Sequence, residues 1–326
     1  MGAEKTVIER QFFRTLSVKA CLRNAETECG TVKEKYGVAV VLAMMIGMMI
    51  CWGMYLPETE KAAAEMGTAV SVETPSLSAG AAVLMDGEDG RILYQLNGNQ
   101  KMYPASTTKI MTALTALKIC EELDLGLDSE ILVPPEAIGV EGSSIYLKEG
   151  ERISLEELLY GMMLQSGNDA AVAVAASLGG NMESFLERMN EEAQDLGCSG
   201  THFVNPHGLP DPEHYTTAAD LAFISREALR DVDFQRIVST KEWNSTAASD
   251  GGRTFVNKNK TLFQYDGGDG VKIGYTKASG RTLVASATRD GRQLIAVVLN
   301  DGNWFQDAYR LLDYGFEIME GEGGNP

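Results

Sequence analysis

The chain has 326 residues, of which 44% are apolar and 23% charged, so its composition excludes disordered, collagen-like and coiled-coil proteins and predicts a packed core. Lys and Arg number 28 against 46 Asp and Glu, and the net charge of −18 argues against a nucleic-acid partner, because phosphate binding needs a basic surface. The five cysteines are widely spaced, and we expect them to be reduced and structural.

Residues 37–56 are the first recognisable element, an uncharged apolar run whose length as a helix is about 30 Å, the thickness of a bilayer core. Lys33 and Lys35 adjoin this run, so the positive-inside rule predicts a cytoplasmic tail at 1–36 and export of the remaining residues. We therefore expect a transmembrane anchor at 37–56. The alternative is a cleaved signal peptide, with a candidate cleavage site at the three alanines 62–64.

Residues 57–77 are small and polar and contain proline, which is typical of a linker. The runs AGAAVLMD and RILYQL then predict two strands joined by a hairpin turn at 87–90. Apolar residues at helical spacing predict a buried helix at 107–123, beginning close to Ser106. Further helices are predicted at 155–164, 169–178, 182–196 and 217–230.

The final third of the chain changes from helical to strand periodicity. The runs GVKIGYT, RTLVASAT and RQLIAVVLN predict three strands, and a last amphipathic helix is predicted at 303–318. Strands at both ends with helices between them indicate an α+β fold, in which one sheet of about five strands brings the two ends together. The helices are expected to flank the sheet and to form a mainly helical subdomain.

Several familiar chemistries have no motif in the chain, including GxxxxGK[ST], GxSxG, HExxH and the EF-hand loop. The three histidines, His202, His207 and His214, fall in one loop region, but their spacing matches no recognised set of metal ligands. We therefore assign no metal and no cofactor.

A nucleophile that needs no histidine is suggested by Ser106-Thr107-Thr108-Lys109, at a loop-to-helix junction. Residues three apart on a helix share a face, so the Ser106 hydroxyl and the Lys109 amine can meet. Lysine can deprotonate serine only if burial or a second cation lowers the lysine pKa, and Lys272 is a candidate cation. Alone, SxxK is a weak signal, because this spacing occurs by chance on solvated helix faces.

Two further motifs follow in order: Ser166-Gly167-Asn168 between two predicted helices, and Lys272-Ile273-Gly274 on a predicted strand. The three motifs together resemble the signature of the penicillin-recognising serine enzymes. The contexts YPASTTKIMTALTAL, LLYGMMLQSGNDAAVAVA, THFVNPHGLPDPEHYTTAADLA and DGVKIGYTKASGRTLVASAT are similar to the D-alanyl-D-alanine carboxypeptidases among low-molecular-weight penicillin-binding proteins. The resemblance covers about residues 78–318 and implies the DD-peptidase/β-lactamase-like fold, with a catalytic domain at 78–320 and a short tail at 321–326.

The resemblance also implies roles for individual residues. Ser106 would attack the carbonyl between the two D-alanines of a peptidoglycan stem peptide, with Lys109 as its general base. Ser166 would relay a proton to the leaving amine. Asn168 would hydrogen-bond the substrate backbone, and Lys272 would attract the terminal carboxylate of the substrate. Gly274 would leave room for the substrate against the strand. The N–H group of Tyr275 would form an oxyanion hole together with that of Ser106.

Ile273 is a departure from the family pattern, which has Thr or Ser between Lys and Gly. The loss of that hydroxyl is expected to lower catalytic efficiency without changing stability. Many relatives also continue into a β-rich second domain and an amphipathic C-terminal anchor, so membrane attachment of this chain is expected to fall to residues 37–56.

The sequence thus predicts a serine D,D-carboxypeptidase at the extracytoplasmic face of the bacterial membrane, or secreted if residues 37–56 are cleaved off. Stem peptides ending in D-Ala-D-Ala are its expected substrates and β-lactams its expected inhibitors. One alternative is a catalytically impaired homologue that binds stem peptides as a scaffold or sensor, for which Ile273 is the sequence support. A β-lactamase is a third reading, but no deacylating carboxylate can be assigned.

Overall fold

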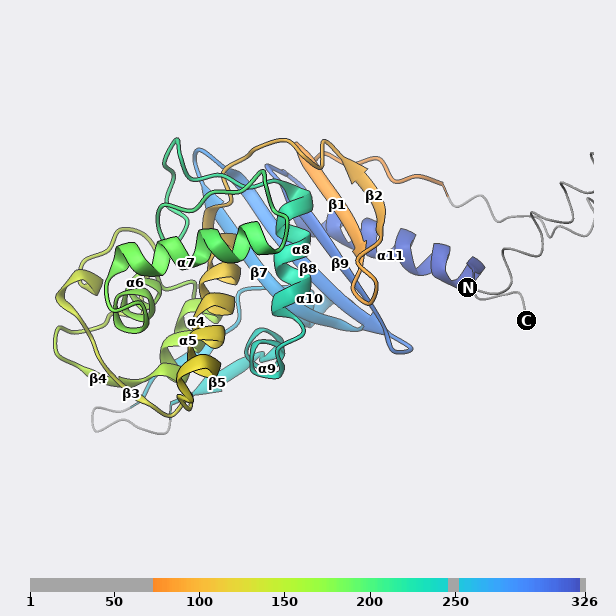
Figure 1. Cartoon of the computed structure of the whole chain (residues 1–326). Coiled ribbons are helices and arrows are strands. Elements are labelled where there is room, and N and C mark those ends of the chain that lie inside the picture. Colours follow the sequence, from red (N-terminus) through yellow and green to blue (C-terminus); the bar gives the residue numbers. More distant parts are fainter. Residues whose placement is uncertain (1–72, 246–251, 323–326) are drawn as a thin grey trace, which may run out of the picture. The chain divides into compact units, whose positions relative to one another are not determined.

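The computed structural model describes residues 73–245 and 252–322 (Figure 1). The predicted tail at 1–36, the predicted span at 37–56 and most of the predicted linker lie outside these residues. Within the two described stretches, none of the helices combines the length and the apolar character that a membrane crossing requires.

A five-stranded antiparallel sheet forms the centre of the fold, in the order β2-β1-β9-β8-β7. The first strand therefore lies beside the last, as the orange and blue arrows of Figure 1 show, with Val83 opposite Val297. This arrangement confirms the α+β prediction. The strands are β1 (Ala81–Asp86), β2 (Ile92–Leu96), β7 (Gly268–Thr276), β8 (Gly280–Arg289) and β9 (Arg292–Leu299).

The long helices follow the predicted order. They are α4 (Lys109–Leu123), α5 (Leu155–Leu164), α6 (Asn168–Leu178), α7 (Met182–Asp195), α8 (Ala218–Ala228) and α11 (Trp304–Glu322), and a short 3-10 turn, Ala105–Thr108, leads into α4. The smaller elements were not predicted: α9 (Val232–Ser239), α10 (Thr261–Gln264), and the two hairpins β3 (Glu130–Leu132) with β4 (Arg152–Ser154) and β5 (Glu242–Asn244) with β6 (Thr254–Val256). Strands of three residues are too short to show an alternating pattern.

Apolar residues cover both faces of the sheet, so the central strands are buried on both sides. On one face, Leu84 and Leu294 pack in a cluster with residues of α11. On the other face, Val83 and Val284 belong to a larger cluster shared with the helical part of the fold, α4 to α9. Strand β7 lies at the edge of the sheet, which leaves one side of its backbone available for another extended chain.

The chain enters this domain through a hydrogen-bonded clamp at Ser78. The Ser78 N–H donates to the carboxylate of Asp307 at 2.5 Å, and its hydroxyl donates to that of Asp301, also at 2.5 Å. Both aspartates are buried, and the hydrogen bonds from Ser78 offset part of the cost of burying them. The second side-chain oxygen of Asp301 has no hydrogen-bond partner among the described residues. It holds the chain where the predicted linker ends.

Candidate active site

Ser106 lies in the 3-10 turn that leads into α4, close against the edge strand. Ala105 has a left-handed φ of +49°, and its carbonyl accepts a hydrogen bond of 2.8 Å from the Thr108 hydroxyl. The turn abuts β7 at Gly274, where a Cβ atom would lie 2.8 Å from the backbone nitrogen of Ser106. Glycine is therefore required at 274 for the strand to approach the serine this closely.

Lys109 is fully buried one helical turn after Ser106. Its Nζ atom lies 3.1 Å from the Ser106 hydroxyl, 2.7 Å from the Asn168 side-chain oxygen and 2.7 Å from the His207 carbonyl oxygen. Burial and, secondly, the charge of Lys272 hold the pKa of Lys109 well below its usual range. An amine that gives up its proton readily, next to a serine hydroxyl, is the arrangement that activates a nucleophile.

Lys272 is buried on β7, on the side of the sheet that faces the helices. Its cross-strand partner Val284 belongs to the helix-facing cluster, whereas the partner of Ile273, Leu283, belongs to the cluster against α11. Burial, with a smaller contribution from Lys258, lowers the pKa of Lys272 to about 7. Lys272 therefore places a titratable cation beside the site, and Ile273 packs partly buried on the opposite side of the strand.

The segment between α5 and α6 brings Asn168 to Lys109. While its side-chain oxygen accepts from Lys109, its side-chain nitrogen donates to the Glu141 carbonyl at 2.6 Å. Ser166 is 7% exposed and has a left-handed φ of +64°. In the described part of the chain, the Ser166 hydroxyl makes no hydrogen bond to Ser106, Lys109 or Lys272. Catalytic hydrogen bonds are often long in free enzymes, so this does not remove it from the site.

The predicted site residues thus fall into two sets. Ser106, Lys109 and Asn168 are joined by direct hydrogen bonds, and Gly274 contacts the backbone of Ser106. Lys272 acts on Lys109 through its charge. Ser166 lies two positions before Asn168 in the sequence, and Tyr275 directly follows Gly274. Tyr275 is 63% exposed on the edge strand.

The block that contains His207 and His214 supports the catalytic turn through its backbone, which agrees with the structural role expected from its turn-forming residues. The His207 carbonyl accepts from Lys109, and Gly208 follows with φ +91° at a point where a Cβ would lie 1.8 Å from the Ala105 oxygen. His214 is fully buried, receives the Val204 N–H at Nδ1, and contacts the Thr108 hydroxyl through Nε2 at 2.8 Å. Burial lowers the pKa of His214 to about 3, so the ring is neutral.

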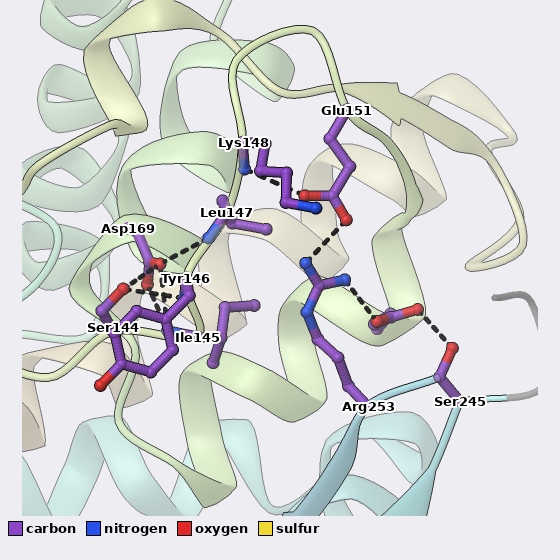
Figure 2. Close-up of polar contacts among 10 residues, drawn as sticks. Ser144, Ile145, Tyr146, Leu147, Lys148, Glu151, Asp169, Ser245 and Arg253 are labelled. Carbon is purple, nitrogen blue, oxygen red and sulfur yellow. Dashed lines mark hydrogen bonds and ion pairs between the residues drawn. The ribbon is translucent and has the colours of Figure 1, made fainter. Parts of the chain in front are cut away.

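Asp169 is a second residue of the site that sequence reasoning missed. It directly follows Asn168 at the start of α6 and is 3% exposed. Its carboxylate accepts hydrogen bonds from Ser144, Ile145 and Leu147 (Figure 2), which fixes this loop to the start of α6. Its position next to the Ser-Gly-Asn motif is the one signal that could have drawn attention to it.

Comparison with known families identifies the chain. Residues 68–303 match the model of the D-alanyl-D-alanine carboxypeptidase family, Peptidase_S11. The chain belongs to this family. The match contains Ser106, Lys109, Ser166 and Lys272, and it covers the whole five-stranded sheet.

Curated members of the family include D-alanyl-D-alanine carboxypeptidase DacF of Bacillus subtilis, 34% identical over 73% of this chain, and DacC of Escherichia coli, 36% identical over 77%. The chain spans 62% and 64% of the lengths of these two relatives. Among solved structures, the Streptomyces K15 DD-transpeptidase has a TM-score of 0.70 at 31% identity, covering 76% of this chain and all of that one. Penicillin-binding protein 6B of Escherichia coli has a TM-score of 0.71 at 34% identity, covering 76% and 80%. Both confirm the DD-peptidase fold.

Proposed function

We propose that this chain is a serine D,D-carboxypeptidase, which removes the terminal D-alanine from peptidoglycan stem peptides through an acyl-enzyme and is acylated by β-lactams. The observation that carries the proposal is the 3.1 Å contact between the Ser106 hydroxyl and the Lys109 amine, in a buried setting that lowers the pKa of the amine. Family membership supplies the substrate class.

In the proposed acylation step, neutral Lys109 takes the hydroxyl proton as Ser106 Oγ attacks the carbonyl carbon between the two D-alanines. The negative charge that develops on the carbonyl oxygen is stabilised by the N–H groups of Ser106 and Tyr275. Each such donor is worth about 3–4 kcal/mol in serine hydrolases. The close approach at Gly274 supports this, because it brings the Ser106 nitrogen against the strand that carries Tyr275.

Collapse of the tetrahedral intermediate breaks the C–N bond, and the amine of the leaving D-alanine takes a proton relayed by Ser166. The charge of Lys272 holds the terminal carboxylate of the substrate. Asn168 hydrogen-bonds the substrate backbone on the acyl side. Water then attacks the ester on Ser106, releasing the shortened peptide and restoring the free hydroxyl.

A second candidate function is transpeptidation, in which an amine rather than water resolves the acyl-enzyme. It is favoured by the likeness to the Streptomyces DD-transpeptidase, all of which this chain covers. The first acylation step is the same in both reactions. The alternative of an impaired stem-peptide-binding scaffold rests on Ile273 alone.

We further propose that residues 78–320 form the catalytic domain, with 321–326 as a tail, and that residues 37–56 attach it to the extracytoplasmic face of the bacterial membrane. Peptidoglycan lies outside the cytoplasm, so an enzyme acting on it must be exported. Both the retained anchor and the cleaved signal meet this requirement.

The deciding experiment incubates the purified full-length chain with a pentapeptide ending in D-Ala-D-Ala and measures released D-alanine. An amine acceptor such as glycine is added in a parallel reaction to separate hydrolysis from transfer. We expect D-alanine release, an acyl-enzyme on Ser106 by mass spectrometry, and hydrolysis as the major outcome. Binding of the peptide without acylation would support the scaffold instead, and a product joined to glycine would support transpeptidation.

A further inference from the structure

The loop Glu141–Leu147, here called the Tyr146 loop, lies directly over the start of α6 (Figure 2). Its backbone accepts two hydrogen bonds from Asn168: the N–H donates to the Ser143 carbonyl at 2.7 Å, and the side chain donates to the Glu141 carbonyl. The loop is therefore attached to the same side chain that contacts Lys109. The loop therefore adjoins the candidate site.

A buried carboxylate fixes the central part of this loop. Asp169 accepts from the Ser144 hydroxyl at 2.6 Å, from the Ile145 N–H at 3.0 Å and from the Leu147 N–H at 3.2 Å. The donors lie on both sides of Tyr146. Several hydrogen bonds to one carboxylate offset its loss of hydration, so Asp169 holds the loop in this shape.

Tyr146 itself is held in an unusual state. Its neighbours Ile145 and Leu147 are buried, whereas Tyr146 is 83% exposed and has a left-handed φ of +62°. A bulky residue rarely adopts this conformation, and an exposed aromatic ring adds little to folding. The buried Asp169 carboxylate thus holds a loop whose aromatic ring is exposed to solvent. A ring that is held in place without contributing to the core indicates a ligand-binding role.

The far end of the loop is also tied down (Figure 2). The Lys148 N–H donates to the Glu151 carboxylate at 3.0 Å, and Arg253 bridges Glu151 at 2.7 Å and Glu157 of α5 at 3.0 Å. The loop is thereby fixed to α5 as well as to α6. A ring presented by a preorganised loop loses little conformational entropy when it binds a ligand.

The direction of the substrate follows from the proposed function, on which this inference rests. If the terminal carboxylate meets Lys272 and the scissile carbonyl meets Tyr275, the acyl half of the peptide runs past the carboxyl end of β7. Asn168 contacts that acyl half, and the Tyr146 loop is attached to Asn168. The loop therefore borders the residue that precedes the two D-alanines, which in stem peptides is a diamino acid.

We propose that Tyr146 is a specificity-determining residue for the side chain of that diamino acid, and that Asp169 is its positioning residue. The phenol ring offers an apolar face to a long aliphatic chain and a cation–π contact to the ammonium at its end. The exposed Glu141 at the start of the loop adds a carboxylate of favourable sign.

The test compares the turnover of two tripeptides, acetyl-L-Lys-D-Ala-D-Ala and acetyl-L-Ala-D-Ala-D-Ala. Acylation by penicillin, which contains no diamino acid, is measured as a third reaction. Tyr146→Ala should lower kcat/KM for the lysine peptide by about 5- to 30-fold, mainly through KM. The alanine peptide and the penicillin acylation rate should change less than about 2-fold. Tyr146→Phe should behave like the native chain, and Val232→Ala, which removes another exposed apolar side chain, is the matched control.

Asp169→Asn tests the positioning role. The measured quantity is the ratio of kcat/KM for the lysine peptide to kcat/KM for the alanine peptide. If Asp169 acts by positioning Tyr146, the double variant should lower this ratio by less than the combined effects of Asp169→Asn and Tyr146→Ala. Additive effects on this ratio would remove the positioning role. Equal losses on both peptides and on penicillin would mean that Tyr146 serves the fold.

Binding of the lysine peptide to the Ser106→Ala variant, measured by calorimetry, separates this inference from the proposed function. Weaker binding after Tyr146→Ala supports the subsite even if turnover is absent. Unchanged binding and turnover overturn it while leaving the carboxypeptidase intact. A native chain that neither binds nor cleaves either peptide, yet is acylated by penicillin, overturns both the stem-peptide substrate and this subsite.

Discussion

Lys109 and Asn168 are 59 positions apart in the sequence, yet the amine of one lies 2.7 Å from the side-chain oxygen of the other. The contact joins the first residue of α4 to the first residue of α6, directly after the turn that carries Ser106. It gives the amine a fixed position, so that Lys109 points at the serine hydroxyl rather than at solvent. Together with the contact to the His207 carbonyl, this contact orients the Lys109 amine so that it can take the proton of the Ser106 hydroxyl.

Ser106→Ala should abolish covalent labelling by a fluorescent penicillin. The variant keeps the fold, because the turn is held by the Thr108 hydroxyl and by Gly208, neither of which involves the Ser106 side chain. Labelling is measured on a denaturing gel. Ser184→Ala, at an exposed serine on α7, is the control and should label normally. Persistent labelling of the Ser106 variant would place the nucleophile elsewhere.

Lys109→Ala should lower the acylation rate by about 10²- to 10⁴-fold, the usual contribution of a general base. The hydroxyl of Ser106 would lose the group that accepts its proton. Stopped-flow measurement with a chromogenic β-lactam gives the rate, and the melting temperature shows whether the fold persists. A near-normal rate in a folded variant would assign the base to another residue.

The pH dependence of kcat/KM should have two limbs. Neutral Lys109 is the active base, so the rate is lost as the pH falls through its lowered pKa. Lys272 binds the carboxylate only when charged, so kcat/KM should decline as the pH rises through about 7. Lys272→Met should lower kcat/KM, remove the alkaline limb and move the acidic limb to higher pH, because Lys109 then loses a repelling charge. A profile that keeps its alkaline limb in this variant contradicts the assignment.

Ile273 lies on the side of β7 opposite Lys272, so Ile273→Thr tests whether a hydroxyl at this edge-strand position still reaches the substrate carboxylate; if it does, kcat/KM should rise by about 10- to 100-fold. The sequence predicts no cost in stability, but the packing of Ile273 beside Leu283 corrects this expectation. Loss of apolar contact should lower the free energy of unfolding by about 1–2 kcal/mol. Ile273→Val keeps most of the packing and has no hydroxyl. Equal rates for the two variants would mean that position 273 does not contact the carboxylate.

The predicted span at 37–56 can be tested in intact cells. A retained anchor predicts full-length protein in the membrane fraction, with external protease reaching residues beyond 57 but not residues 1–36. Antibodies to tags at the two ends follow the fragments. A mature N-terminus near Ala64, read by mass spectrometry, would instead identify a cleaved signal peptide.

The sequence predicted the elements whose periodicity is long enough to read, such as the helix ending at Leu123 and the three C-terminal strands. It did not predict β3 to β6, where three residues carry no period. The SxxK spacing correctly placed the Ser106 and Lys109 side chains together, because both belong to one helical turn. The contact of Lys109 with the His207 carbonyl could not be predicted, because a backbone oxygen leaves no mark on residue type.

At Ala105, whose backbone is left-handed, a substitution can leave the melting temperature unchanged and still disturb the position of the catalytic serine. Glycine would adopt φ +49° without steric cost, which stabilises the folded state. Glycine would also give the unfolded chain more conformational freedom, which destabilises the folded state. Each effect is about 1 kcal/mol, so the two nearly cancel. A screen for melting temperature would therefore barely register Ala105→Gly. The serine that follows would nevertheless sample a wider range of positions, so an engineered chain could keep its heat resistance and lose its rate.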